Sequence, residues 1–185
     1  MVGGLARFAR LMASYPGGVH NGPMERSPEP EALDETGAVL GWLAFHRDAL
    51  AAKCEGLTAA QLVTASAPPS SLTLLGLVRH LTEIERDYLV NELSGRNTGF
   101  VYTDDDEDAD IERLDASMVG DSMARWGDER AEADAILGRY DDLSALGPSG
   151  KYPVRVYVLK VLQEYARHNG HADIIRERID GVRGE

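Results

Sequence analysis

Four long stretches of the chain repeat apolar residues every three or four positions, which is the period of an α-helix packed on one face. They cover residues 31–55, 72–93, 114–140 and 153–179. Residues 154–159 are rich in β-branched side chains and also fit a strand, but the period of four continues beyond them, which favours a helix. Amphipathic helices bury their apolar faces against one another, so the sequence predicts an all-α four-helix bundle.

The region before the first helix is dense in proline and glycine, as expected of an irregular segment. We therefore predict a flexible N-terminal extension over residues 1–30 and one helical domain over residues 31–185. The total of 185 residues suits one domain with a single core. Met24, followed by Glu25, is a candidate for the true start of the protein, in which case residues 1–23 would not belong to it.

The formal net charge of −12 limits the classes of partner. A chain with no basic excess cannot displace counterions from a phosphate backbone, so we expect no nucleic acid partner and no anionic membrane surface. No apolar run approaches the roughly 20 residues of a membrane helix. Cys54 is the only cysteine, so no intramolecular disulfide can form, and a cytoplasmic location is expected. We interpret Cys54 as a small buried apolar side chain.

The fourth stretch carries a carboxylate and two imidazoles on one helical face. Glu164, His168 and His171 follow one another at spacings of four and three. These side chains supply the oxygen and nitrogen donors that zinc, nickel, iron(II) and manganese accept. A metal site needs a further ligand from another helix, and His80 in the second stretch is the candidate. The alternative is that Glu164 and His168 form an ordinary pair on the helix surface and that His80 is a histidine of the core without a metal.

Two further histidines are candidates for catalytic roles near such a site. His171 has three interpretations: a ligand in place of His168, a group that contacts a ligand, or a base near the metal. His46 lies in the middle of the first helix, next to Phe45, and is able to reach the same cavity. Three protein ligands leave coordination positions for water or substrate, which is typical of catalytic rather than structural metal sites.

Several sequence blocks are shared with a known superfamily. They are Trp42 with His46 and Arg47, then residues 54–57, 68–81 and 102–105, and most specifically residues 164–173 followed by 176–181. On these blocks, residues 33–185 resemble the DinB-like superfamily of damage-inducible four-helix bundles, in particular an actinobacterial branch of undefined function. The superfamily name refers to a damage response and does not imply DNA binding.

The resemblance implies one divalent metal, often zinc or nickel, bound by three histidines or by two histidines and a glutamate. Mapped onto this chain, the ligands are His80, Glu164 and His168. Similar sequences often carry histidine at the position of Lys160. An ammonium group there is able to pair with Glu164 and compete with the metal, or to bind an anionic group of a substrate.

The similar proteins with an assigned activity are mycothiol-dependent isomerases and thiol S-transferases. The resemblance therefore implies a metal-dependent S-transferase or isomerase, with a low-molecular-weight thiol such as mycothiol and a small electrophile as substrates. Two alternatives stay open. One is a metal-binding stress protein without turnover, for example a homodimer that buries part of the first and fourth helices. The other is a metal-dependent hydrolase that activates water at the same site.

Overall fold

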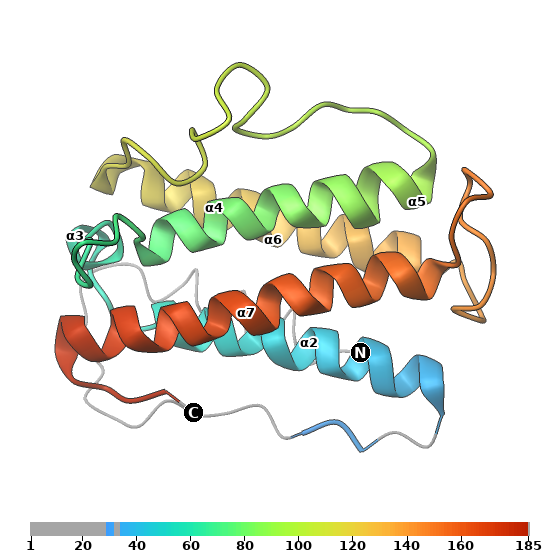
Figure 1. The fold of residues 1–185 in the computed structure, drawn as a ribbon, viewed down its shortest axis with the longest axis horizontal. Coiled ribbons are helices and arrows are strands. Elements are labelled where there is room, and N and C mark those ends of the chain that lie inside the picture. The colour runs from blue at the N-terminus through green and yellow to red at the C-terminus, as the bar shows by residue number, and fades with distance from the viewer. Residues whose placement is uncertain (1–28, 32–33, 185) are drawn as a thin grey trace.

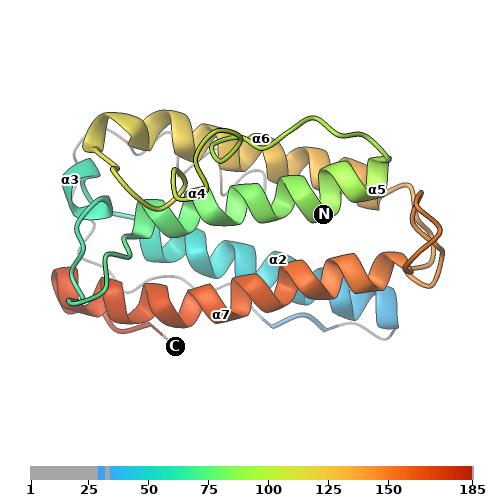
Figure 2. The ribbon, with the colours of Figure 1, turned by 45° about the horizontal axis from the view of Figure 1, so that its top comes forward.

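The computed structural model describes residues 29–31 and 34–184, and its described part is a bundle of helices (Figures 1 and 2). The elements in chain order are α2 (Glu35–Cys54), α3 (Ala59–Leu62), α4 (Leu74–Ile84), η1 (Glu85–Asn91), α5 (Glu92–Ser94), η2 (Ala116–Met118), α6 (Val119–Leu137) and α7 (Val154–Asp180). The prediction of an all-α four-helix bundle is confirmed. The extension predicted for residues 1–30 lies almost wholly outside the described residues.

The four long members of the bundle enclose one apolar core. Leucines at positions 43, 50, 77 and 81 are fully buried, and so is Trp126 on α6. The indole Nε1 of Trp126 donates a hydrogen bond to the hydroxyl of Tyr165 on α7 at 2.7 Å, so both polar groups are satisfied inside the core. None of the helices in this part of the chain has both the length and the hydrophobicity of a membrane span.

Cys54 ends α2 within this core, as expected from the sequence. Burial raises the pKa of its thiol to about 12, against the weaker opposing influence of Arg176 and Lys53. A thiol with such a pKa is almost entirely protonated at neutral pH and is a poor nucleophile. Cys54 therefore acts as a packing residue.

The helix ends follow the capping signals of the sequence, with two corrections. Thr58 caps α3 and forms a capping box with Gln61. The helix of the second stretch begins after Thr73, whose hydroxyl accepts the N–H of Gly76 at 3.0 Å, so it starts at Leu74 and not at the predicted residue 72. Pro153 is the N-cap of α7 and not its first helical residue.

The predicted ends of the third stretch were also too wide. A short 3₁₀ turn, η2, precedes α6, which ends at Leu137 rather than at residue 140. Residues 142–146 form an irregular turn, which is closed by an isolated β-bridge between Leu146 and Pro153.

The second long helix changes its winding in the middle. The segment η1 is a π-helix, and at its end the N–H of Glu92 donates to the carbonyl of Asp87, five positions back. The sequence predicts a single α-helix over residues 72–93, which is wrong for this segment. The buried carboxylate of Glu85, the first residue of η1, accepts two hydrogen bonds from Arg47 on α2, at 2.7 and 2.5 Å. Short π segments of this kind are rare and are often found at functional sites.

The long connection between α5 and η2 is tied to the side of α4. The carboxylate of Glu83 accepts the backbone N–H groups of Val101 at 2.8 Å, Tyr102 at 2.5 Å and Thr103 at 3.1 Å. The guanidinium of Arg79 lies 3.6 Å from the centre of the Tyr102 ring, and it donates to the carbonyl of Ala109 at 2.8 Å. These contacts place the loop directly beside α4.

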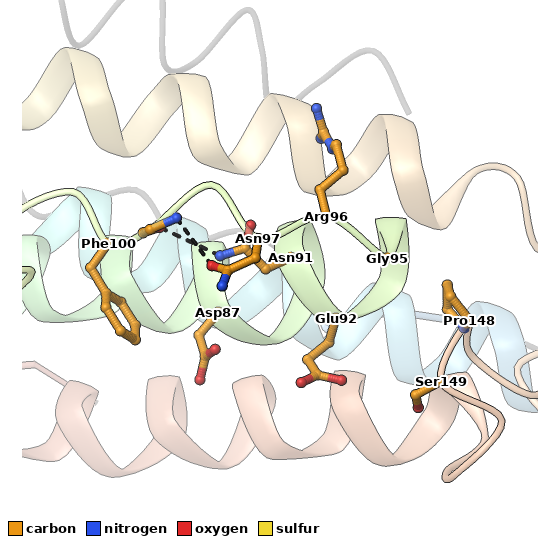
Figure 3. Close-up of a pocket in the computed structure, with 10 residues that line it drawn as sticks. Asp87, Asn91, Glu92, Gly95, Arg96, Asn97, Phe100, Pro148 and Ser149 are labelled. Carbon is orange, nitrogen blue, oxygen red and sulfur yellow. Dashed lines mark hydrogen bonds between the residues drawn. The ribbon is translucent and has the colours of Figure 1, made fainter.

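A pocket of about 620 Å³ opens near one end of the bundle, where α5 approaches the loop that leads into α7 (Figure 3). Its walls come from η1, α5, the start of the long connection, and the turn at Pro148 and Ser149. The pocket is lined by η1 and α5, which continue the helix α4 that carries His80 towards its C-terminal end.

Candidate metal centre

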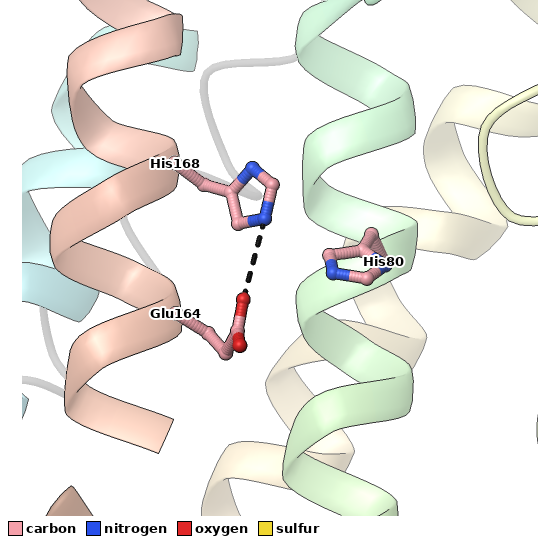
Figure 4. A group of neighbouring side chains, drawn as sticks. All are labelled: His80, Glu164 and His168. Carbon is pink, nitrogen blue, oxygen red and sulfur yellow. Dashed lines mark ion pairs between the residues drawn. The ribbon is translucent and has the colours of Figure 1, made fainter. Parts of the chain in front are cut away.

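Three donors from two helices meet between α4 and α7 (Figure 4). His80 comes from α4, and Glu164 and His168 come from α7. One ligand atom from each residue can be chosen so that all three lie within 4.8 Å of one another. The sequence predicted these three residues as ligands, and the fold brings them together although 84 positions separate the first from the second.

The spacing of these donor atoms is compatible with a single ion. Nε2 of His168 lies 3.5 Å from Oε2 of Glu164. Two ligands bound tetrahedrally at bond lengths of about 2.0–2.2 Å are separated by about 3.4 Å, so this pair already has the required separation. The third donor, on His80, lies within 4.8 Å of the other two. Glu164 and His168 are buried and His80 is partly exposed, so the centre opens to solvent on the side of α4.

Asp110 fixes the orientation of the His80 ring. Nδ1 of His80 lies 2.9 Å from Oδ2 of Asp110, which is only 5% exposed. A carboxylate accepts hydrogen bonds, so Nδ1 carries a proton, and in the neutral tautomer that this leaves, Nε2 is the nitrogen with a free lone pair. A carboxylate behind a ligating histidine is a recurrent feature of metal sites. The sequence analysis missed Asp110, because it lies in the irregular connection, where no helical period marks its direction.

The ring of His168 is neutral at physiological pH. Burial lowers the pKa of its imidazole to about 4, and the nearby His80 and His171 act in the same direction. A metal ligand must be the neutral imidazole, so this environment suits ligation. The rings of His168 and His80 have their centres 4.8 Å apart.

His171 contacts the far side of the His168 ring. The two Nδ1 atoms are 3.2 Å apart, so one of them donates a hydrogen bond to the other. If the proton lies on Nδ1 of His168, its Nε2 keeps a lone pair for a metal ion and faces Glu164. Of the three interpretations of His171, this geometry agrees with a group that contacts a ligand. Its catalytic role stays a prediction.

Lys160 pairs with the carboxylate of Glu164, which was one of the two roles expected for it. Its Nζ lies 2.6 Å from Oε1 of Glu164, and this hydrogen bond raises the pKa of Lys160. Burial opposes ionisation of Glu164, but the hydrogen bond and the charge of Lys160 outweigh it, so the pKa of Glu164 is lowered. The carboxylate is therefore ionised at neutral pH, with Oε1 paired and Oε2 directed towards His168.

His46 is placed apart from the three donors. Its backbone carbonyl accepts a hydrogen bond from the side-chain amide of Asn169 at 2.9 Å, and its ring packs edge-on against Phe45. Asn169 follows His168 on α7 and points about 100° away from it around the helix axis. The contacts of His46 are therefore on the side of α7 that faces α2, and its catalytic role stays a prediction.

Comparison with models of known protein families gives a match over most of the chain. A family model described as MST, mycothiol-S-transferase, matches residues 38–181. This range contains all three donors and nearly the whole described bundle. No curated protein and no solved structure gives a significant match.

Proposed function

Since the chain belongs to the mycothiol-S-transferase family, we propose that it is a metal-dependent enzyme that joins a low-molecular-weight thiol of the mycothiol type to a small electrophile. The observation that supports a metal is the convergence of His80, Glu164 and His168 within 4.8 Å. An isomerisation assisted by the same thiol would use the same site. The −12 charge favours a small-molecule substrate over nucleic acid.

The donor set fits a divalent ion such as zinc or nickel. We assign Nε2 of His80, Nε2 of His168 and Oε2 of Glu164 as the ligands, because each of these residues has its other polar atom paired with a neighbour. When bound, the ion would lower the pKa of a coordinated thiol, so that the thiolate is available at neutral pH. Three protein ligands leave room for that thiol.

The neighbours of the ligands have separate roles in this proposal. Asp110 keeps the proton of His80 on Nδ1, away from the metal side. His171 does the same for His168 by accepting a hydrogen bond from its Nδ1. Because this contact occupies Nδ1 of His171, we assign the proton that the thiol loses to solvent. The ammonium of Lys160, with a side chain 37% exposed, is able to bind an anionic group of the electrophile. We assign no step to His46.

The direct test is a thiol-transfer assay on protein loaded with zinc or nickel. The protein is mixed with mycothiol and 1-chloro-2,4-dinitrobenzene, and the thioether product is followed by its absorbance. We expect kcat/KM to fall by about 100-fold or more in His168→Ala, since a ligand is lost. Hydrolysis of an ester or amide without any thiol would instead favour the hydrolase alternative. A metal-loaded protein with no turnover of either kind would favour a binding protein.

The proposal also covers the cellular location of the enzyme and its oligomeric state. A cytoplasmic location follows from the chemistry, because free thiols are kept reduced there.

A homodimer that buries part of α2 and α7 stays a prediction. Light scattering after size-exclusion chromatography measures the mass directly, and a monomer mass at micromolar concentration would contradict it.

A further inference from the structure

The open side of the candidate metal centre lies between the faces of α4 and α7 that carry the three donors. His80 is partly exposed there, whereas Glu164 and His168 are buried. Figure 4 shows the side chains of both α7 donors directed towards α4. A molecule from solvent reaches the donors through this side, so the side chains along its rim are the ones that select the substrate.

Two cationic side chains lie on the part of the rim that α7 contributes. Lys160 and Arg167 are seven positions apart, which is about two turns, so they point the same way from the helix. Glu164 lies between them, one turn from each. Burial lowers the pKa of His168, and the charge of Arg167 adds to this effect. The hydrogen bond with Glu164 raises the pKa of Lys160, and the charge of Arg167 opposes the rise. Arg167 therefore acts on the groups at the centre through its charge.

These two cations differ in the partners that they already have. Nζ of Lys160 lies 2.6 Å from Oε1 of Glu164. Arg167 is exposed, and no described residue forms a hydrogen bond or an ion pair with its guanidinium. The carboxylate of Asp110, behind the ring of His80, is occupied by Nδ1 of that ring. Among the described residues of this rim, Arg167 is thus a charged group that stays available to a ligand.

An available guanidinium favours one class of ligand. Its planar fork donates two parallel hydrogen bonds to a carboxylate, which the compact ammonium of a lysine does not do. The net charge of −12 repels anions from the molecule as a whole. A cation at the rim offsets that repulsion at one place, so a small carboxylate is attracted to the metal centre rather than to the rest of the surface.

An aromatic ring lies on the opposite part of the rim. His80, Ile84 and Tyr88 follow one another at spacings of four, and the wider winding of η1 keeps Tyr88 nearer to the face of His80 than a regular α-helix would. Tyr88 is partly exposed, and the centre of its ring lies 5.9 Å from Nζ of Lys160. The ring therefore borders the same gap as the cations and offers a flat apolar surface to a ligand.

We propose that Arg167 determines the specificity for the electrophile, by binding a carboxylate of a molecule whose planar body packs against Tyr88. This inference rests on the proposed function and narrows the electrophile to flat, unsaturated or aromatic carboxylates. In the transfer step, the sulfur of the thiolate bonds to the electrophilic carbon, the leaving group departs with its bonding electron pair, and the proton of the thiol passes to solvent. Arg167 holds the carboxylate and takes part in no bond change.

The test compares two electrophiles that differ in charge, 4-chloro-3,5-dinitrobenzoate and 4-chloro-3,5-dinitrobenzamide. Both lose chloride to a thiolate. Each is mixed with mycothiol and zinc-loaded protein, and kcat/KM is divided by the rate of the uncatalysed reaction. We expect the benzoate to be preferred about fivefold or more, as suits an exposed guanidinium. Arg167→Gln should reduce this preference to about one, mainly through KM, because binding of the substrate is lost.

Arg139→Gln is the matched control, since it removes the same charge at an exposed position beyond the end of α6. It should keep the preference of the wild type. Equal use of the two electrophiles by the wild type, or the same preference in Arg167→Gln and Arg139→Gln, would overturn the role of Arg167. Tyr88→Leu should raise KM for both electrophiles about threefold or more. An unchanged KM in that variant would overturn the role of Tyr88.

Binding is measured apart from turnover with 3,5-dinitrobenzoate, which has no chloride to lose. A titration followed by saturation-transfer NMR on the metal-free full chain removes any direct contact between the carboxylate and a metal. We expect millimolar dissociation constants for the wild type and Arg139→Gln, and about fivefold weaker binding by Arg167→Gln. Equal binding by all three proteins would contradict a carboxylate site at Arg167.

The two proposals fail in different ways. Transfer of the thiol to both electrophiles without any preference would overturn the role of Arg167 and leave the function standing. Binding of 3,5-dinitrobenzoate that depends on Arg167, in a protein that transfers no thiol to either electrophile, would overturn the function, while the carboxylate site would stand.

Discussion

Each donor of the candidate metal centre has one neighbour that contacts the polar atom turned away from the metal. Asp110 contacts the first imidazole, His171 the second, and Lys160 the carboxylate. Such neighbours set the tautomer and the orientation of the ligands, and their loss commonly weakens metal binding by about 10- to 100-fold. Asp110 carries a negative charge and Lys160 a positive one, however. Removal of these two charges should therefore change the affinity for the metal in opposite directions.

Asp110→Asn should weaken metal binding. The amide cannot replace the carboxylate as a charged acceptor for the proton on Nδ1 of His80, so the ring loses its fixed tautomer. We expect about tenfold or more weaker affinity for zinc, measured by competition with a chromophoric chelator. Asp105→Asn, an exposed position of the same loop, is the control. Equal affinity in the two variants would show that Asp110 does not position the ligand.

Lys160→Gln should strengthen metal binding. The ammonium lies 2.6 Å from one oxygen of Glu164 and repels a cation bound at the other. Removing this charge should tighten zinc binding about fivefold, while stability changes by less than about 1 kcal/mol, because the side chain is partly exposed. Weaker binding in the variant, measured with the same chelator, would refute the competition. If Lys160 also binds the electrophile, KM should rise in the same variant.

At the scale of elements, the long connection acts as part of the metal centre because it is fixed to α4 at three points. Glu83, Arg79 and His80 lie along one helix and bind the connection through backbone groups, a ring and a carboxylate. The position of Asp110 therefore depends on contacts of Glu83 and Arg79, which are not metal ligands, as well as on its own contact with His80.

Glu83→Ala should release this anchoring. Three backbone N–H groups lose a carboxylate acceptor, and we expect unfolding free energy to fall by about 3 kcal/mol. Amide hydrogen exchange at residues 101–103 should speed up by about tenfold or more. Glu107→Ala, exposed in the same connection, is the control. Unchanged exchange at these three amides would contradict the anchoring.

The sequence predicted the helices well but not their finer features. The apolar period identified every long helix, and the spacing of four placed Glu164 and His168 on one face. The π-helix was missed, because one extra residue per turn over a short segment hardly disturbs an apolar stripe. Thr73 was missed as a cap, because serines just before it carry the same signal. Asp110 was missed, because contacts between a loop and a helix have no periodic pattern.

At the scale of the whole molecule, the metal centre results from the way that α4 packs beside α7. Neither helix contains a complete ligand set, and only their packing brings residue 80 to residues 164 and 168. The spacing of Glu164 and His168 on one helix was readable in the sequence. His80 was the candidate ligand from another helix, and the resemblance mapped the same residue. The net charge of −12 attracts divalent cations to the surface in general, so a specific site must be separated from weak surface binding.

Titration of zinc into metal-free protein by calorimetry, with wild type, His80→Ala, His168→Ala and the surface control Asp128→Asn, tests the metal centre most directly. We expect about one tight site per chain in the wild type and the control, with a zinc-dependent rise in melting temperature. Both histidine variants should fold, keep only weak binding, and lose that rise. The same stoichiometry, affinity and melting shift in all four proteins would contradict a metal centre at these residues.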